Sequence, residues 1–114
     1  MSDTPLPKAF HAHVYFDDHQ APDAEQLCTT LSQKFDLKMG RVHKGPVGPH
    51  PRGSCQISVP FDKLADTLQW LMMNRGEFTV FVHAITGDDW IDHTQGVMWL
   101  GASETLKLDI FRQK

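Results

Sequence analysis

Histidine is the residue type through which this sequence most plainly offers chemistry. The chain of 114 residues contains seven histidines, and they do not form a run at either end. Neutral imidazole binds zinc, copper and iron, and it exchanges protons near neutral pH. The excess of histidine therefore predicts a metal site or acid–base catalysis, provided that the fold brings several of them together. The seven are His11, His13, His19, His43, His50, His83 and His93.

His11 and His13 form the pair with the closest spacing. Apolar and polar residues alternate strictly through residues 10–16, which predicts a half-buried strand with both imidazoles on one face, about 6.6 Å apart at the Cα atoms. Both rings can then bind one ion, although a His-X-His pair on a strand also occurs as a plain solvated face. If segment 78–84 pairs antiparallel with this strand, His83 becomes the expected third ligand, and His93 emerges from the same end.

His50 lies between two prolines in the loop 45–53, which holds three glycines and three prolines. Because proline fixes φ, such a loop has few conformations and suits the presentation of an imidazole. A rigid loop with an incidental histidine explains the pattern equally well. We expect this loop at the end of the sheet opposite His11, which favours substrate contact or a contribution across a dimer interface over metal binding.

Two arginines and two aromatic residues are the candidates for substrate binding. Arg41 and Arg52 could each hold a carboxylate through two parallel hydrogen bonds, or they could serve only as surface charges. Tyr15 and Phe81 share the strand parity of the histidines. Both are therefore expected on the same sheet face as the histidines.

Two hydrophobic periods predict the elements that position these residues. Alternation predicts strands over 10–16, 41–44, 54–59 and 78–84, and spacing by three and four predicts helices from Pro22 to about residue 38 and over 61–72. The order β-α-β-β-α-β is typical of an α+β, ferredoxin-like fold. We expect an antiparallel sheet in the order 4-1-3-2, with both helices on one face, followed by a C-terminal extension.

The second sheet face needs a cover from a partner subunit, the C-terminal tail or a ligand. Four imidazoles and Phe81 are predicted on that face, and a fully solvated phenylalanine there is unfavourable. We therefore expect a homodimer.

Length and composition set limits on the whole chain. They predict one domain over residues 1–114 that begins with a loose arm over residues 1–9. Apolar residues make up 40% and the formal net charge is −3, which argues against disorder and against a nucleic-acid partner. Short apolar runs argue against a membrane span, and the first residues lack the pattern of a signal peptide. With only Cys28 and Cys55, we expect reduced thiols and a cytoplasmic location.

Three segments carry a resemblance: HAHVYFD at 11–17, GPVGPHP at 45–51, and VHAITGDD followed by DHT and WLG within 82–101. Over about residues 9–109, the chain resembles the DOPA 4,5-dioxygenase family of bacteria and fungi. The resemblance implies extradiol cleavage of a catechol, such as DOPA or a related dihydroxyphenyl compound, by a non-haem Fe(II) enzyme that uses O2. In that scheme His50 or His93 would act as the acid or base, and Tyr15 and Phe81 would pack on the ring of the substrate. A purified sample could hold zinc or another divalent metal.

The expected metal ligands depart from the usual pattern of extradiol enzymes, which is two histidines and one carboxylate. Asp17 lies about 13 Å along the strand from His13, and Glu77 lies about 20 Å from His83 at ~3.3 Å per residue. Neither fits easily. A site of His11, His13 and His83 is therefore expected, with a ligand from Asp88, Asp89 or Asp92 as the alternative.

A second class of function also fits the sequence. A dimeric ferredoxin-like protein could bind a small molecule on the same sheet face without turnover, or a cofactor-free oxygenase could use that face. About one iron or zinc per chain after anaerobic purification favours the metal enzyme over both.

Overall fold

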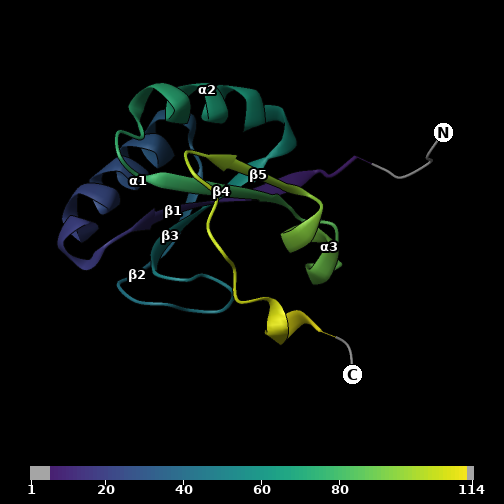
Figure 1. Ribbon diagram of the computed structural model, residues 1–114. Coiled ribbons are helices and arrows are strands. Elements are labelled where there is room, and N and C mark those ends of the chain that lie inside the picture. Colours follow the sequence, from purple (N-terminus) through teal and green to yellow (C-terminus); the bar gives the residue numbers. More distant parts are fainter. Residues whose placement is uncertain (1–5, 113–114) are drawn as a thin grey trace.

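The structure is a computed structural model, which describes residues 6–112 and contains one five-stranded sheet (Figure 1). The strands follow the order β2-β3-β1-β4-β5, and all neighbours are antiparallel. Two long helices, α1 (Ala21–Phe35) and α2 (Leu64–Asn74), cover one face. The α+β, ferredoxin-like fold predicted from the sequence is thus confirmed, with a fifth strand beside β4. The strands are β1 (Ala9–Phe16), β2 (Lys38–His43), β3 (Gly53–Pro60), β4 (Thr79–Ala84) and β5 (Val97–Leu100).

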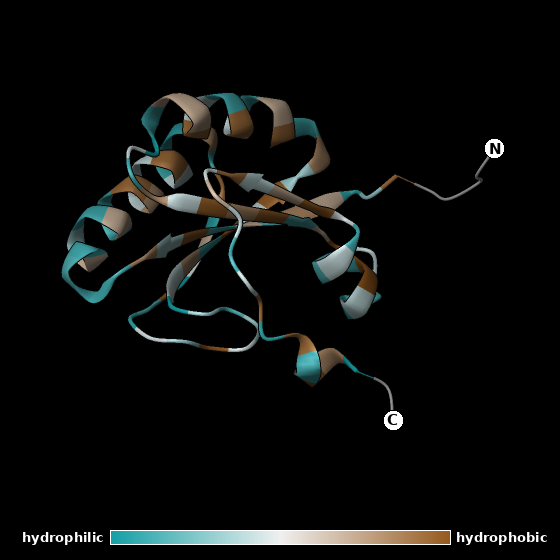
Figure 2. Ribbon diagram, viewed as in Figure 1, coloured by the Kyte–Doolittle hydropathy of each residue, from teal (hydrophilic) through white to brown (hydrophobic). Residues whose placement is uncertain are grey.

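The core lies between the helices and the sheet. Alternate residues of β1, β3 and β4 point toward α1 and α2, as their period of two requires. Figure 2 shows hydrophobic residues concentrated in the central strands, and hydrophilic ones along the outer turns of α1. Cys28 and Cys55 are both buried in this core and form no disulfide. The fully buried aliphatic members include Val14, Leu31, Ile57, Leu71 and Val80.

The end of α1 and the start of β2 differ from the prediction. The helix ends at Phe35, because Asp36 takes a left-handed conformation with φ 55°. Aspartate is one of the few residues other than glycine that visits this region, so the helix stops before Gly40, the predicted breaker. β2 consequently begins at Lys38, three residues before the predicted strand 41–44.

The sheet face opposite the long helices is covered by the chain itself. The β2–β3 loop crosses it from one side, and residues 85–112 cross it from the other (Figure 1). The second segment contains the short helix α3 (Asp89–Thr94), β5 and a 3-10 turn at Leu108–Phe111. Tyr15 and Phe81 are 0% exposed beneath these segments. The predicted reason for a homodimer, an uncovered Phe81, therefore disappears; the homodimer itself stays a prediction for light scattering.

The ends of the chain are described only in part. Ala9 belongs to β1, although the sequence predicted it in a loose arm, and residues 1–5 of that predicted arm lie outside the described part. No helix within residues 6–112 has both the length and the apolar character that a membrane span requires.

Candidate metal centre

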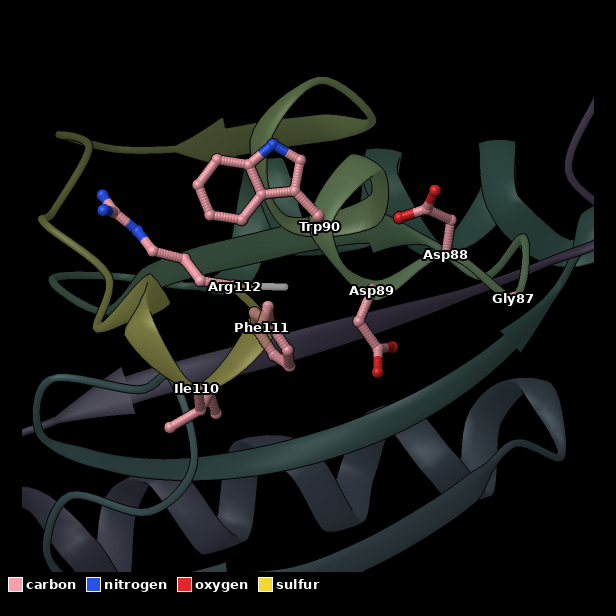
Figure 3. Close-up of a pocket in the computed structure, with 7 residues that line it drawn as sticks. All are labelled: Gly87, Asp88, Asp89, Trp90, Ile110, Phe111 and Arg112. Atoms are coloured by element: carbon pink, nitrogen blue, oxygen red, sulfur yellow. The ribbon is translucent and has the colours of Figure 1, made fainter. Parts of the chain in front are cut away.

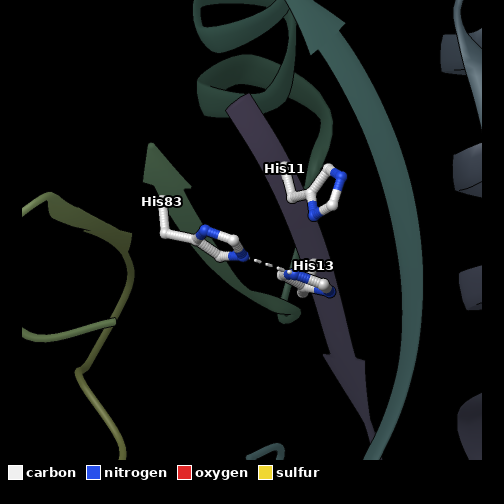
Figure 4. A group of neighbouring side chains, drawn as sticks. All are labelled: His11, His13 and His83. Atoms are coloured by element: carbon white, nitrogen blue, oxygen red, sulfur yellow. Dashed lines mark hydrogen bonds between the residues drawn. The ribbon is translucent and has the colours of Figure 1, made fainter. Parts of the chain in front are cut away.

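Pairing of β1 with β4 brings three histidines together. His11 lies directly opposite His83, and His13 lies two residues further along β1 on the same face. Each residue offers one ring nitrogen, and these nitrogens all lie within 4.8 Å of one another. Figure 4 shows the three rings gathered between the two strands. We call this group the histidine triad; it consists of the three residues that were predicted as metal ligands.

The spacing of the ring nitrogens suits one shared ion. His13 Nε2 and His83 Nε2 are 3.1 Å apart. Two imidazoles that bind one ion at ~2.0–2.1 Å, with an angle of roughly 90–110° between them, place their nitrogens about 2.9–3.4 Å apart. His83 Nδ1 lies 2.9 Å from the Ala84 carbonyl, which assigns its proton to Nδ1 and keeps the Nε2 lone pair available. The donor set therefore fits a divalent transition metal.

Burial keeps the triad in the protonation state that binds metals. Burial lowers the pKa of His83 to about 4. It also lowers the pKa of His13 well below its ordinary value, and the positive charge of neighbouring imidazoles acts in the same direction. The pKa of the half-buried His11 is lowered for the same reasons. All three rings are thus neutral near pH 7, and a neutral imidazole is the form that acts as a ligand.

His50 lies beside the triad rather than at the far end of the sheet. Its ring centroid is 4.1 Å from that of His13, and its Nδ1 is 2.6 Å from the Tyr15 hydroxyl. The expectation that the loop would place His50 away from His11 and His13 was wrong. The β2–β3 loop folds back over the sheet, and the backbone of His50 donates to the Val47 carbonyl to close a tight turn.

His93 approaches the triad from the other side. It lies in α3, where its Nδ1 is 2.7 Å from the Asp89 carbonyl, which leaves its Nε2 lone pair available. Its ring centroid is 4.2 Å from that of His83, and the Phe111 ring stacks on it at 4.4 Å. The sequence placed His93 at this end of the sheet, and the structure brings it into contact with His83.

Two of the three carboxylates near the triad have structural partners. Asp92 accepts hydrogen bonds from the backbone and the hydroxyl of Thr86 at 2.8 and 2.6 Å, and Asp88 accepts from the backbone of Ile91 at the start of α3. Asp89 lines the cavity beside the triad. Within residues 6–112, the one group of histidine, cysteine and acidic side chains close enough to share an ion is the histidine triad. The geometry therefore favours three histidines over a carboxylate ligand.

The two candidate arginines are placed differently. Arg52 is bound by its own chain: Glu104 takes two of its hydrogen bonds and Asp17 takes a third. These three hydrogen bonds are to carboxylates of the same chain, so the guanidinium does not have the free donors that we expected it to offer to a substrate carboxylate. Arg41 is exposed and lines a cavity of about 200 Å³ together with His43 and Gln56.

Tyr15 and Phe81 also differ from their expected role. Both are 0% exposed, and neither lines the cavity beside the triad. Both contact the imidazoles instead. The Tyr15 hydroxyl is hydrogen-bonded to His50. The centroid of the Phe81 ring lies 5.4 Å from that of His83 and 4.6 Å from that of Trp99. Contact with a substrate ring would require both to move.

One cavity opens at the triad, and a larger groove adjoins it. The inner one has a volume of about 300 Å³ and is lined by all of the triad together with His50 and His93. A larger groove of about 920 Å³ lies between α3 and the C-terminal turn and shares Gly87, Asp89 and Phe111 with the first. Figure 3 shows Arg112 alongside the Trp90 indole at this groove, with Phe111 below them. A planar ring in the inner cavity could therefore carry a substituent that extends outward.

Sequence reasoning missed the residues that cover the site. Trp99, Glu104 and Phe111 all lie beyond the last predicted strand. Only Trp99 had a usable signal, the continuous apolar run of residues 97–100 between two glycines. Apolar and charged residues alternate over residues 106–110, which is typical of a strand, but the structure has a 3-10 turn at Leu108–Phe111.

Comparison with known proteins identifies the relatives of this chain. The family model described as the Dopa 4,5-dioxygenase family matches residues 10–110. A DOPA 4,5-dioxygenase from Amanita muscaria is 32% identical over 110 residues, which cover 89% of this chain and 48% of the relative. An uncharacterized 21.2 kDa protein from Botryotinia fuckeliana is 30% identical over 120 residues, which cover 95% of this chain and 64% of the relative. The chain thus spans about half to two thirds of these curated relatives.

A solved structure shows the same fold over nearly the whole chain. It is a crystal structure from Nostoc punctiforme, described as that of a candidate dioxygenase, and it is 36% identical in sequence. The TM-score is 0.89, and the match covers 96% of this chain and 95% of the other.

Proposed function

The chain belongs to the Dopa 4,5-dioxygenase family, and from this premise we propose that it is a metal-dependent dioxygenase that cleaves the ring of a catechol. The observation that carries the proposal is the histidine triad, whose three ring nitrogens lie within 4.8 Å of one another. O2 reacts with organic rings slowly without a metal or an organic cofactor. A member of an oxygenase family therefore needs such a group, and the histidine triad offers a site for one metal ion.

Fe(II) is the metal we propose, held by His11, His13 and His83. Bound there, Fe(II) would supply the redox step and bring catechol and O2 together. Imidazole ligands also suit zinc, and zinc binds such sites more tightly than Fe(II). Zinc in a purified sample would therefore not contradict the proposal.

His50 and His93 are the proposed acid–base residues, because both line the inner cavity. A buried hydroxyl proton needs an acceptor, so the Tyr15 hydroxyl donates to His50 Nδ1, and His50 carries its proton on Nε2. His93 has the opposite arrangement, since its Nδ1 donates to the backbone carbonyl of Asp89. We propose that His93 Nε2 accepts a proton from the substrate hydroxyl, and that His50 donates from Nε2.

The substrate we propose is a dihydroxyphenyl compound such as DOPA, the compound in the name of the Amanita muscaria relative. Its ring would occupy the inner cavity. Of the two arginines, only Arg41 has an exposed side chain, without an internal partner among the described residues. It is therefore the remaining candidate for holding a substrate carboxylate. The products formed from a panel of catechols would distinguish 4,5 from 2,3 cleavage.

Anaerobic reconstitution with Fe(II), followed by a panel of catechols and O2, tests the proposal. A yellow semialdehyde chromophore that needs Fe(II), O2 and an intact triad is the expected result. Zinc-loaded protein and His13→Ala serve as inactive controls. Full Fe(II) occupancy without turnover of any catechol would favour a binding protein that uses the same sheet face.

A further inference from the structure

An ion pair outside the histidine cluster ties down the loop that carries His50. Arg52 Nε and Nη2 donate to the two carboxylate oxygens of Glu104 at 3.0 and 2.7 Å. Arg52 Nη1 donates to Asp17 at 3.0 Å. Two parallel hydrogen bonds fix the guanidinium in orientation as well as position. The ion pair therefore joins three segments: the end of β1, the β2–β3 loop and the C-terminal segment.

The same C-terminal segment holds the loop at a second point. The backbone of Lys107 donates to the Pro49 carbonyl at 2.8 Å. Glu104 and Lys107 thus bind the loop at positions 52 and 49, on either side of His50. Within the described residues, the loop has few other anchors; the backbone bond from His50 to Val47 lies inside the loop itself.

The position of His50 depends on where this loop lies. The His50 ring makes a 2.6 Å hydrogen bond with Tyr15 and stands 4.1 Å from the ring of His13. Both contacts come from a loop whose prolines restrict its internal conformation but do not fix it to the sheet. A shift of about 1 Å in the loop would lengthen the hydrogen bond beyond useful range.

We propose that Glu104 is a positioning residue, which through Arg52 holds the His50 imidazole beside His13. Its side chain and that of Arg52 are 23% and 29% exposed, so the ion pair is partly shielded from water and from salt. Within residues 6–112, the Glu104 side chain forms hydrogen bonds with Arg52 and none with a histidine, and it acts on His50 through the loop. The catalytic consequence rests on the proposed function; the structural consequence does not.

The first experiment observes His50 directly in metal-free protein. Ring ¹⁵N signals of histidine-labelled protein, with His50 assigned by comparison with His50→Ala, report whether Nδ1 accepts a hydrogen bond. Glu104→Gln should move the His50 signals toward those of a mobile imidazole that exchanges between tautomers. The matched control is Asp109→Asn, which removes the exposed ion pair to Arg112 in the same C-terminal segment and should leave His50 unchanged.

The second experiment measures kinetics with a double-mutant cycle. Acid–base residues contribute roughly 10²–10⁴-fold, so a displaced His50 should lower kcat by about 10–100-fold in Glu104→Gln. KM and bound metal should stay close to wild type. In a His50→Ala background, Glu104→Gln should lower kcat no further, because residues that act as one unit are not additive.

The two experiments fail in distinguishable ways. Unchanged His50 signals in Glu104→Gln would overturn the positioning role whether or not the protein is an enzyme. Additive losses of kcat would also overturn it, since Glu104 would then act without His50. If the wild type cleaves no catechol while the His50 signals respond as expected, the positioning role stands and the proposed function fails.

Discussion

His13 occupies the middle of the histidine cluster. It lies on the central strand β1, its Nε2 is 3.1 Å from that of His83, and its ring contacts that of His50. Only 3% of it is exposed, so the residues packed around it hold its ring in place. Metal binding should therefore depend on this residue strongly.

His13→Ala and His83→Ala should each weaken metal binding by about 100-fold or more, because even the loss of a residue that only orients a ligand costs ~10–100-fold. Metal content after equilibrium dialysis, measured by atomic absorption, checks this expectation. His19→Ala is the control: His19 is exposed in the turn before α1 and should bind metal as wild type does. Equal metal content in all three variants would place the site elsewhere.

Tyr15 offers a test of the hydrogen bond beneath His50. Tyr15→Phe keeps the ring and removes the hydroxyl, which leaves His50 Nδ1 buried without its donor. An unsatisfied buried group costs about 1–3 kcal/mol, so the free energy of unfolding should fall by that amount. Urea denaturation of metal-free protein measures it. A variant as stable as wild type would show that His50 finds another partner.

At the scale of elements, alternation and helical spacing predicted four of the five strands, the two long helices and the sheet faces. They were sufficient because β1, β3 and β4 each bury one side against the helices, so that residue parity assigns every side chain to a face. His11, His13 and His83 were placed together by this reasoning alone. The positions of the segments that cover the triad could not be predicted from residue parity.

The β2–β3 loop and residues 85–112 were beyond prediction for a physical reason. Their paths are fixed by single contacts between residues far apart in sequence, such as Arg52 with Glu104 and Phe111 with His93. Local periodicity carries no information about such contacts. Hence His50 was placed at the wrong end, and Tyr15 and Phe81 were expected to be accessible.

Gly53 fixes the point where the β2–β3 loop joins β3. A Cβ atom there would lie 2.8 Å from the Phe16 ring and 3.0 Å from the Phe16 carbonyl. Gly53→Ala should therefore destabilise the protein by about 1–3 kcal/mol through overpacking. Gly45→Ala, in the same loop with nothing within 4 Å, should change stability little. Thermal denaturation of the two variants makes the comparison, and equal melting temperatures would contradict it.

At the scale of the whole molecule, the buried imidazoles make stability depend on pH. The pKa of His50 and of His83 is about 4 in the folded protein because burial disfavours the charged ring, against ~6.5 in the unfolded chain. Between these values the unfolded state binds more protons, so stability falls as pH falls from about 6.5 toward 4.

Urea denaturation of metal-free protein at about pH 7 and about pH 5 tests this dependence, since both values lie on either side of the unfolded histidine pKa. The midpoint should be lower at the acidic pH. His83→Gln should show a weaker dependence, whereas the exposed His19→Ala should match wild type. A midpoint independent of pH would mean that these rings bind protons in the folded protein as readily as in the unfolded chain.

A metal shared by β1 and β4 would also act as a cross-link. His13 and His83 are 70 residues apart in sequence, so an ion that joins them closes a long loop, and long loops lose the most entropy when they are closed. The unfolded chain cannot keep the three nitrogens together without the sheet, and binding should therefore raise stability by about RT ln(1 + [metal]/Kd). Melting temperatures that rise with each tenfold increase in free zinc, and that stay constant in His13→Ala, would show that the ion holds the two central strands together.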